Sequence, residues 1–234
     1  APNALKAGVS AYVHKSAKLE ELENAIFKAQ EANLDVVVQR IIPGFDDHMY
    51  PFDAYLNQDS KVTHWITCQK LRQFPINYGA SVYTIQKQIP KLYEMGARFL
   101  EDIGFKGFAE IEFKKDKSTG EYYLIEINAR TTNLNSLIYK VGINMPYLAY
   151  CELTDKFPKP YTIEEDTNIA FWYAYEDFFS IRNYIKSKQL TRKEIMKSFK
   201  RKKAYAIWDI KDPLPSLAFI FQKLKGLFKK IFKR

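Results

Sequence analysis

The chain has 234 residues with a formal net charge of +9, and 47% of its residues are hydrophobic. This length allows one sizeable core or two small lobes around a cleft, and the composition is that of a globular protein rather than a disordered or fibrous one. The two cysteines cannot form a disulfide framework and lack metal-type spacing, so we expect a reducing compartment.

The first quarter of the chain predicts three strands and one helix. The opening residues APNALKAG contain no basic region followed by an apolar run, so we expect no signal peptide. Residues 2–15 are typical of two short strands around a Gly/Ser turn, and the apolar spacing over 18–32 predicts an amphipathic helix. The β-branched run DVVVQRIIPG, residues 35–44, predicts a buried strand that ends in a Pro-Gly turn.

The middle of the chain predicts two hairpins and three helices. Residues 86–103 suit a helix whose regular part starts at Pro90. The second hairpin, residues 107–130, reads GFAEIEFKKDKSTGEYYLIEINAR and turns at KSTG, residues 117–120. The strands of the first hairpin are expected at 49–56 and 61–68, and the remaining helices at 134–141 and 145–154.

Strands and helices continue to alternate irregularly toward the C-terminus. A strand, two helices and another strand are expected at 167–175, 176–188, 191–200 and 203–210. Pro213 and Pro215 interrupt the chain before a closing helix over 216–234. Irregular alternation with hairpins favours an α+β fold, and the sequence contains neither GxGxxG nor GxxxxGK[ST], so no Rossmann site or P-loop is indicated.

Oxygen-bearing side chains gather on one face of the second hairpin. Glu126 and Asn128 are two residues apart in a strand, so their side chains leave the same face. Glu112 falls near Glu126 because position 119, midway between them, lies in the turn. Two carboxylates and an amide oxygen suit Mg²⁺, which binds carboxylates together with phosphates and waters. Arg130 continues this face, where its guanidinium could bind a phosphoryl oxygen.

An exposed strand with ordinary surface charges is the alternative interpretation of this hairpin. Its acids would then pair with Lys114 and Lys115 on a solvated face. The apolar sequences FAEIEF and YYLIEINA argue against that alternative, because an isolated buried charge is costly. The histidines and cysteines are scattered, and we expect them to pack rather than to bind or react.

The hairpin resembles the metal-binding signature of the ATP-grasp ligases. EIEFK and then EINAR are similar to the paired strands of that family, whose second strand reads E-x-N-x-R. The run from VVVQRIIPG to MPYLAY, residues 36–150, resembles the D-aspartate ligase-like and carbamoyl-phosphate-synthase-like members. The resemblance to the family covers residues 1–155. The resemblance implies an α+β ATP-grasp fold with two lobes that clamp ATP. The first lobe, the second lobe with its metal-binding hairpin and a C-terminal extension would occupy 1–42, 43–165 and 166–234.

The resemblance also implies an activity and a set of site residues. A carboxylate would be activated by ATP as an acyl phosphate and coupled to an amine, in cell-envelope or peptide metabolism. Glu112, Glu126 and Asn128 would hold two Mg²⁺ ions, with Mn²⁺ as an alternative. The catalytic residues would be Arg130 and the basic pair Lys70 and Arg72, and the nucleotide-binding residues would be Lys6, Lys15, Gln39, Arg40, Ile41, Ile42 and Asp46.

Other readings of the same residues stay open. An ordinary exposed strand is the alternative for the pair at 70 and 72. Enzymes of this type carry a further domain before the first lobe, so a partner domain or subunit could complete the pocket. The chain could also be a nucleotide-binding subunit without catalysis, or a membrane-surface scaffold with a vestigial site. We expect small-molecule substrates and no nucleic acid partner.

The basic residues concentrate near the C-terminus. Residues 186–234 contain 16 Lys and Arg against three acids, a net charge of +13, so residues 1–185 carry 9 − 13 = −4. Residues 216–234 read as a basic amphipathic helix, which favours peripheral attachment to an anionic membrane. A terminal helix docked on the core, with its lysines in solvent, is the alternative. The expected location is cytoplasmic, with the inner face of the membrane as the second option.

Overall fold

The computed structural model describes residues 18–35, 38–156 and 158–231, which fall into two compact units. The first unit, residues 1–41, contains helix α2 (Leu19–Glu31), which confirms the helix predicted over 18–32. The strand predicted over 35–44 is wrong for residues 38–44, which form no strand. Val38 and Ile41 are 57% and 53% exposed, so this segment lacks the buried surroundings that a core strand needs. The strands predicted over 2–15 lie outside the described residues.

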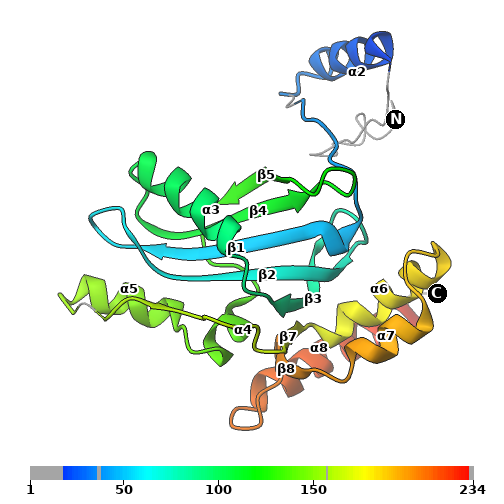
Figure 1. Cartoon of the computed structure of the whole chain (residues 1–234). Coiled ribbons are helices and arrows are strands. Elements are labelled where there is room, and N and C mark those ends of the chain that lie inside the picture. The colour runs from blue at the N-terminus through cyan, green and yellow to red at the C-terminus, as the bar shows by residue number, and fades with distance from the viewer. Residues whose placement is uncertain (1–17, 36–37, 157, 232–234) are drawn as a thin grey trace. The chain divides into compact units, whose positions relative to one another are not determined.

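The second unit, residues 42–234, is built on one sheet with the spatial order β5-β4-β1-β2-β3-β7-β8, and β6 pairs with β2 (Figure 1). Neighbouring strands are antiparallel, except that β2 with β6 and β7 with β8 are parallel. The strands are β1 (Met49–Leu56), β2 (Val62–Phe74), β3 (Ala80–Gln86), β4 (Gly107–Lys115), β5 (Tyr122–Asn128), β6 (Tyr161–Thr162), β7 (Ile169–Trp172) and β8 (Lys202–Tyr205).

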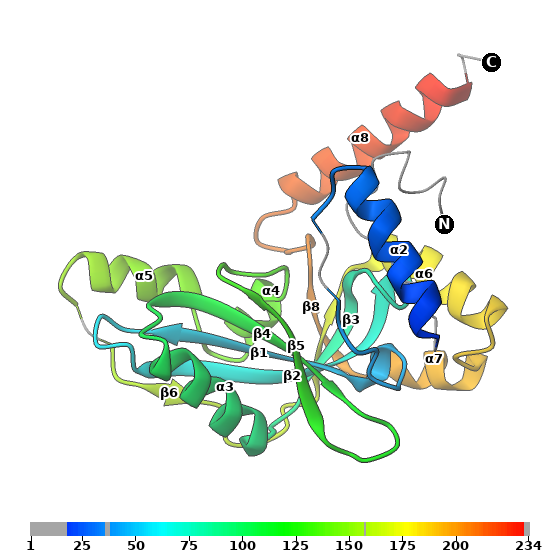
Figure 2. The ribbon, with the colours of Figure 1, turned by 90° about the horizontal axis from the view of Figure 1, so that it is seen from above.

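Helices cover both faces of this sheet (Figures 1 and 2). Helix α3 packs Leu92 and Leu100 against Phe52 and Ile111 on one face. Helices α4 and α5 pack on the opposite face in a second core that includes Ile66. The remaining helices follow toward the C-terminus. The helical elements of this unit are η1 (Asp46–His48), α3 (Pro90–Asp102), α4 (Asn135–Lys140), α5 (Met145–Leu153), α6 (Ala174–Lys186), α7 (Arg192–Ser198) and α8 (Leu214–Ile231).

A glycine sets the distance between α3 and the sheet. A Cβ atom at Gly96 would lie 2.5 Å from Cδ1 of Phe52, whose side chain is fully buried in β1. The helix can approach β1 this closely because position 96 carries no side chain. Helix α3 thereby covers the apolar side chains of β1 and β4 on the face opposite the predicted site.

The α+β class and both predicted hairpins are confirmed. Strand β3 was not predicted, and β8 is shorter than the strand expected over 203–210. Helix α8 begins at Leu214, before the expected Ser216, because Pro215 is tolerated in a first helical turn. Within the described part of the chain, no helix is both long and apolar enough to cross a bilayer.

The C-terminal residues complete the same sheet rather than forming a layer of their own. Strand β7 pairs with β3, and β8 pairs with β7. The division into lobes at 1–42 and 43–165 with an extension at 166–234 stays a prediction, while the contacts join the last two ranges through these strands.

Candidate active site

Four carboxylates lie on one face of the sheet, across three adjacent strands. Asp53 in β1 is opposite Glu110 in β4, and Glu112 in β4 is opposite Glu126 in β5. Residues two apart in a strand share a face, so these four side chains gather there, and we call them the acidic face. The predicted register of the hairpin, with Glu112 beside Glu126, is confirmed. Asn128 lies opposite Glu110 and joins the group.

The turn between β4 and β5 fixes this register. Oδ1 of Asp116 accepts hydrogen bonds from the backbone N–H and the hydroxyl of Ser118, at 2.8 and 2.5 Å. The chain then reverses through Gly120 at φ +76°, a conformation that favours glycine. The predicted KSTG turn therefore places the two strands so that their acids meet.

Hydrogen bonds link the acidic face to the residues after β5. The Nδ2 group of Asn128 donates to Oε2 of Glu110 at 3.0 Å and to Oε1 of Glu126 at 3.1 Å. Arg130 donates from Nη2 to Oδ1 of Asn128 at 3.0 Å. The Arg130 side chain is therefore held at the exposed rim, next to the amide that the sequence predicted as a metal ligand.

Burial and mutual repulsion disfavour the ionised forms of the carboxyl groups on this face. Burial, with the Glu112 charge adding to it, raises the pKa of Asp53 to about 7 despite a hydrogen bond from Thr132 and the nearby Lys70. Burial, with the charges of Asp53 and Glu112, raises the pKa of Glu110 to about 8. Such shifts mark groups that would be stabilised by added positive charge.

Lys70 is the cation that faces these carboxylates. Its side chain is 4% exposed and forms an ion pair with Oε1 of Glu112, whose side chain is 14% exposed. The surface alternative, in which the acids pair with Lys114 and Lys115 in solvent, is therefore wrong for Glu112. The alternative of an ordinary exposed strand is wrong for Lys70 as well.

Two buried oxygen atoms beside the acidic face lie next to a small pocket. Oδ2 of Asp53 and Oδ1 of Asn135 are buried and have no hydrogen-bond partner among the described residues. Both residues line a pocket of about 10 Å³ that Arg130 also borders, which is space for one water-sized group. Among the described residues, no three His, Cys, Asp or Glu side chains converge closely enough to form a ready-made metal site.

Asp53 and Glu110 were not predicted as site residues. Alternation along β4 could have indicated Glu110, because it lies two residues before Glu112 and must share its face. Asp53 is a single acid in the apolar strand MYPFDAYL, which is a weaker signal, since the sequence alone does not show that β1 pairs with β4.

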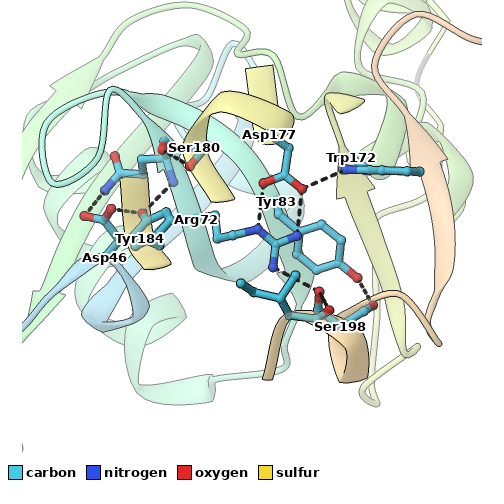
Figure 3. Close-up of polar contacts among 10 residues, drawn as sticks. Asp46, Arg72, Tyr83, Trp172, Asp177, Ser180, Tyr184 and Ser198 are labelled. Atoms are coloured by element: carbon cyan, nitrogen blue, oxygen red, sulfur yellow. Dashed lines mark hydrogen bonds and ion pairs between the residues drawn. The ribbon is translucent and has the colours of Figure 1, made fainter. Parts of the chain in front are cut away.

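Arg72 contacts residues of α6 and α7 rather than the acidic face, and Figure 3 shows it between Asp177 and Ser198. Its guanidinium donates to Asp177 of α6 through Nε at 2.6 Å and Nη2 at 2.7 Å, and through Nη1 to Ser198 of α7 at 2.9 Å. The side chain is 1% exposed, and Cζ lies 4.1 Å from the centre of the Tyr83 ring. The register of β2 shifts between residues 70 and 72, so simple alternation fails there. The structure does not bring Arg72 together with Lys70.

Asp46 is also fully engaged by other side chains (Figure 3). Its Oδ1 accepts from Nε2 of Gln73 at 2.7 Å, and its Oδ2 accepts from the backbone N–H of Asn77 at 2.9 Å and from the hydroxyl of Tyr184. Burial, followed by the Asp46 charge and hydrogen bond, raises the pKa of Tyr184 above its usual range. The Asp46 carboxylate, predicted to bind the nucleotide, therefore connects η1 to β2 and α6.

The other predicted nucleotide-binding residues are only partly described. Gln39, Arg40 and Ile41 are exposed residues of the first unit, and Ile42 is buried in the second unit. Lys6 and Lys15 lie outside the described residues. The structure therefore assembles the carboxylates with Asn128, Arg130 and Lys70, and the adenine and phosphate positions stay predictions.

Comparison with known proteins gives one clear sequence match. No protein-family model matches the chain. A D-aspartate ligase from Enterococcus faecium (strain Aus0004) is 31% identical over 130 residues, which is 54% of this chain and 31% of that protein. The chain thus spans about a third of the length of this curated relative.

Solved structures resemble this chain more weakly than the ligase sequence does. An N5-carboxyaminoimidazole synthetase from Staphylococcus aureus, complexed with ADP, has a TM-score of 0.48 and 16% identity over 64% of this chain and 40% of its own. An L-amino acid ligase from Bacillus licheniformis has a TM-score of 0.39 and 21% identity over 57% and 34%. Both TM-scores are below 0.5, so the sequence match is the stronger of these similarities.

Proposed function

We propose that this protein is an ATP-dependent ligase that activates a carboxylate as an acyl phosphate and couples it to an amine. The observation that carries the proposal is the acidic face, with Glu112 opposite Glu126 and with Asn128 and Arg130 beside them, in a chain whose sequence matches a D-aspartate ligase. Transfer of the γ-phosphoryl group to a carboxylate oxygen gives ADP and an acyl phosphate. The amine nitrogen then forms the new bond to the acyl carbon, and phosphate leaves as the nitrogen loses a proton.

The side chains of the acidic face fit divalent cations. Glu112, Glu126 and Asn128 would hold two Mg²⁺ ions, because their oxygens are hard ligands. A bound cation would also favour the ionised forms of Asp53 and Glu110, whose pKa values are raised without it. When bound, the ions would neutralise the phosphate charges and bridge the nucleotide to the protein. The oxygen ligands of this face and the match to a D-aspartate ligase support ATP and Mg²⁺ as the cofactors, with Mn²⁺ as an alternative.

Lys70 and Arg130 would act on the charges of the reacting groups. Lys70 now balances Glu112 from a buried position, so added positive charge on this face would release its ammonium group for a phosphate or carboxylate oxygen. Arg130 is exposed at the rim, where it could bind the transferred phosphoryl group through two N–H donors. Both residues position and stabilise charge, and neither needs to exchange a proton.

The substrates are proposed only by chemical class. The matched relative is named for D-aspartate, and a second neighbour is named for L-amino acids, which supports an amino acid or a similar molecule as one substrate. The chain covers a third of the curated relative, so a further domain or subunit could supply the rest of the pocket. A nucleotide-binding subunit without catalysis is the alternative, and cytoplasmic placement and a metabolic setting stay predictions.

Magnesium-dependent ADP release tests the proposal. The full chain would be incubated with ATP, Mg²⁺ and pairs of carboxylates and amino acids, and ADP would be measured with and without each substrate. We expect release that needs both substrates and the ion. Glu126→Gln should lower the rate at least about 100-fold, since it replaces a charged carboxylate ligand by a neutral amide.

A matched substitution in the same hairpin controls this experiment. Glu121→Gln changes an exposed acid that pairs with Lys91 at 2.9 Å, outside the acidic face, and should leave the rate unchanged. ATP binding without substrate-dependent ADP release in the wild type would favour the non-catalytic subunit. An equal loss in both variants would contradict the assigned role of Glu126.

A further inference from the structure

The last described helix exposes its apolar side rather than burying it. In α8, Leu217, Ile220, Phe221 and Leu224 are 54%, 51%, 67% and 49% exposed. Their spacing of three and four residues places them on one side of the helix, and we call them the apolar stripe. Such a stripe normally packs against a core. Here it faces away from the rest of the unit.

Contacts on the other side of α8 explain why the apolar stripe points outward. The ring of Phe219 lies 5.4 Å from the ring of Tyr175 in α6, edge to face. Nζ of Lys223 lies 4.5 Å from the centre of the Tyr175 ring. Ser216 is buried and donates from its hydroxyl to the carbonyl oxygen of Ile207 at 3.1 Å.

Ser216, Phe219 and Lys223 recur at helical spacing and form the docked side, which differs from the side of the apolar stripe. Helix α8 is therefore docked on its neighbours, as the alternative of a docked terminal helix expects, and Lys223 and Lys225 are exposed. The four side chains of the apolar stripe are exposed as well, so this docking does not bury them.

Further apolar side chains lie just before the stripe. Trp208, Ile210 and Leu214 are 49%, 82% and 71% exposed. Leu214 precedes Leu217 by three residues, which places it on the same side of α8. An exposed apolar surface of this extent, together with a tryptophan, is typical of sites that contact a partner or a lipid interface.

Charge decides which kind of partner fits. Helix α8 contains no Asp or Glu, and residues 186–234 carry a net charge of +13. Lys225 is exposed next to the stripe. Anionic lipid attracts such a segment at about 1 kcal/mol for each basic residue close to the surface, and the apolar side chains then enter the headgroup boundary.

We propose that the apolar stripe of α8 binds the surface of a bilayer that contains anionic lipid. The helix lies along that surface through Leu217, Ile220, Phe221 and Leu224, and the contact of Phe219 with α6 keeps the stripe turned outward. This role is independent of the proposed ligase chemistry, because none of these residues belongs to the acidic face.

Vesicle sedimentation tests the proposal with the full chain. The wild type should bind vesicles of phosphatidylglycerol mixed with phosphatidylcholine, bind vesicles of phosphatidylcholine alone much more weakly, and dissociate as salt is raised. Replacing all four stripe residues by glutamine, which favours helix, should weaken binding at least about tenfold while the circular dichroism spectrum stays unchanged.

An equal loss of exposed apolar surface elsewhere provides the matched control. Tyr139, Tyr147, Tyr150 and Leu153 are exposed on α4 and α5, and the same glutamine substitutions there should leave vesicle binding intact. Equal binding to both kinds of vesicle, or equal loss in both variants, would overturn the proposal. Self-association in analytical ultracentrifugation that only the stripe variant abolishes, without vesicle binding, would instead assign the stripe to a second copy of the chain.

Discussion

Replacing Asp53 with asparagine should make the metal-free protein more stable at neutral and mildly alkaline pH. Asp53 is fully buried in the structure's sheet, with Oδ1 accepting a hydrogen bond from Thr132 at 3.1 Å and Oδ2 without a partner among the described residues. Asparagine keeps the same shape and the oxygen that Thr132 needs. It removes the charge and gains an amide group that can donate to Glu110.

The size of the effect follows from the pKa of the Asp53 carboxyl. Burial raises that pKa from 3.8 to about 7, so the folded protein holds a proton that the unfolded chain has lost. The contribution of Asp53 to the free energy of unfolding is therefore greatest below pH 4, and it falls as the pH rises toward 7. At about 1.4 kcal/mol per pH unit, the free energy of unfolding falls by about 4 kcal/mol in total. This value is an upper bound, because Asp53 and Glu110 interact and titrate together.

Urea unfolding at several pH values, followed by tryptophan fluorescence in the presence of a chelator, measures this effect. We expect the wild type to lose stability between pH 5 and 8, and Asp53→Asn to lose less. The two proteins should differ by about 1.6 kcal/mol at pH 5 and by up to about 4 kcal/mol at pH 8. Asp59→Asn, in the exposed turn between β1 and β2, is the matched control and should follow the wild type.

One result would refute this account of the acidic face. If wild type and Asp53→Asn show the same dependence on pH, then Asp53 is not a repelled, buried carboxyl. If Asp53→Asn is less stable than the wild type at pH 8, then the fold itself stabilises the ionised Asp53 carboxylate, and no bound cation is needed to offset its charge. Either outcome would also weaken the case that Asp53 supports a cation site.

Three further substitutions test the packing and charges described above. Asp177→Asn should lower the free energy of unfolding by about 3–5 kcal/mol, because it leaves the Arg72 guanidinium buried without its counter-charge; a loss below 1 kcal/mol in urea unfolding would contradict this. Gly96→Ala, which in an exposed helix would stabilise, should instead cost about 1–3 kcal/mol, since its Cβ would meet the Phe52 ring; an increased melting temperature would show that α3 can move away. Lys70→Met should leave the acidic face with uncompensated charge, lowering stability most at high pH and abolishing ADP release; full activity would exclude Lys70 from the site.

Local sequence signals predicted much of the sheet and its central hairpin. The alternation of FAEIEF and YYLIEIN, with the KSTG turn between them, was enough to place Glu112 opposite Glu126. Pro90 marked the start of α3 correctly. These features succeed because each depends on contacts within about twenty residues of chain.

Features that depend on distant pairing were missed or misread. Asp53 joins the acidic face because β1 pairs with β4, more than fifty residues away. Arg72 leaves that face because β2 shifts register after Lys70 and because Asp177, far along the chain, offers a carboxylate. The exposed stripe of α8 follows from a tyrosine in α6, which no periodicity within residues 216–234 could reveal.

Strand β2 ties the two ends of the second unit together. It carries Lys70 toward the carboxylates and Arg72 toward α6 and α7, within a span of three residues. Cutting the protein after residue 165, the predicted end of the second lobe, would remove β7, the strand that pairs with β3. It would also remove Asp177 and leave the buried Arg72 guanidinium without its counter-charge. The smallest fragment worth expressing in search of activity therefore has to retain β7 and helices α6 and α7, even though they lie beyond the region that resembles the ligases.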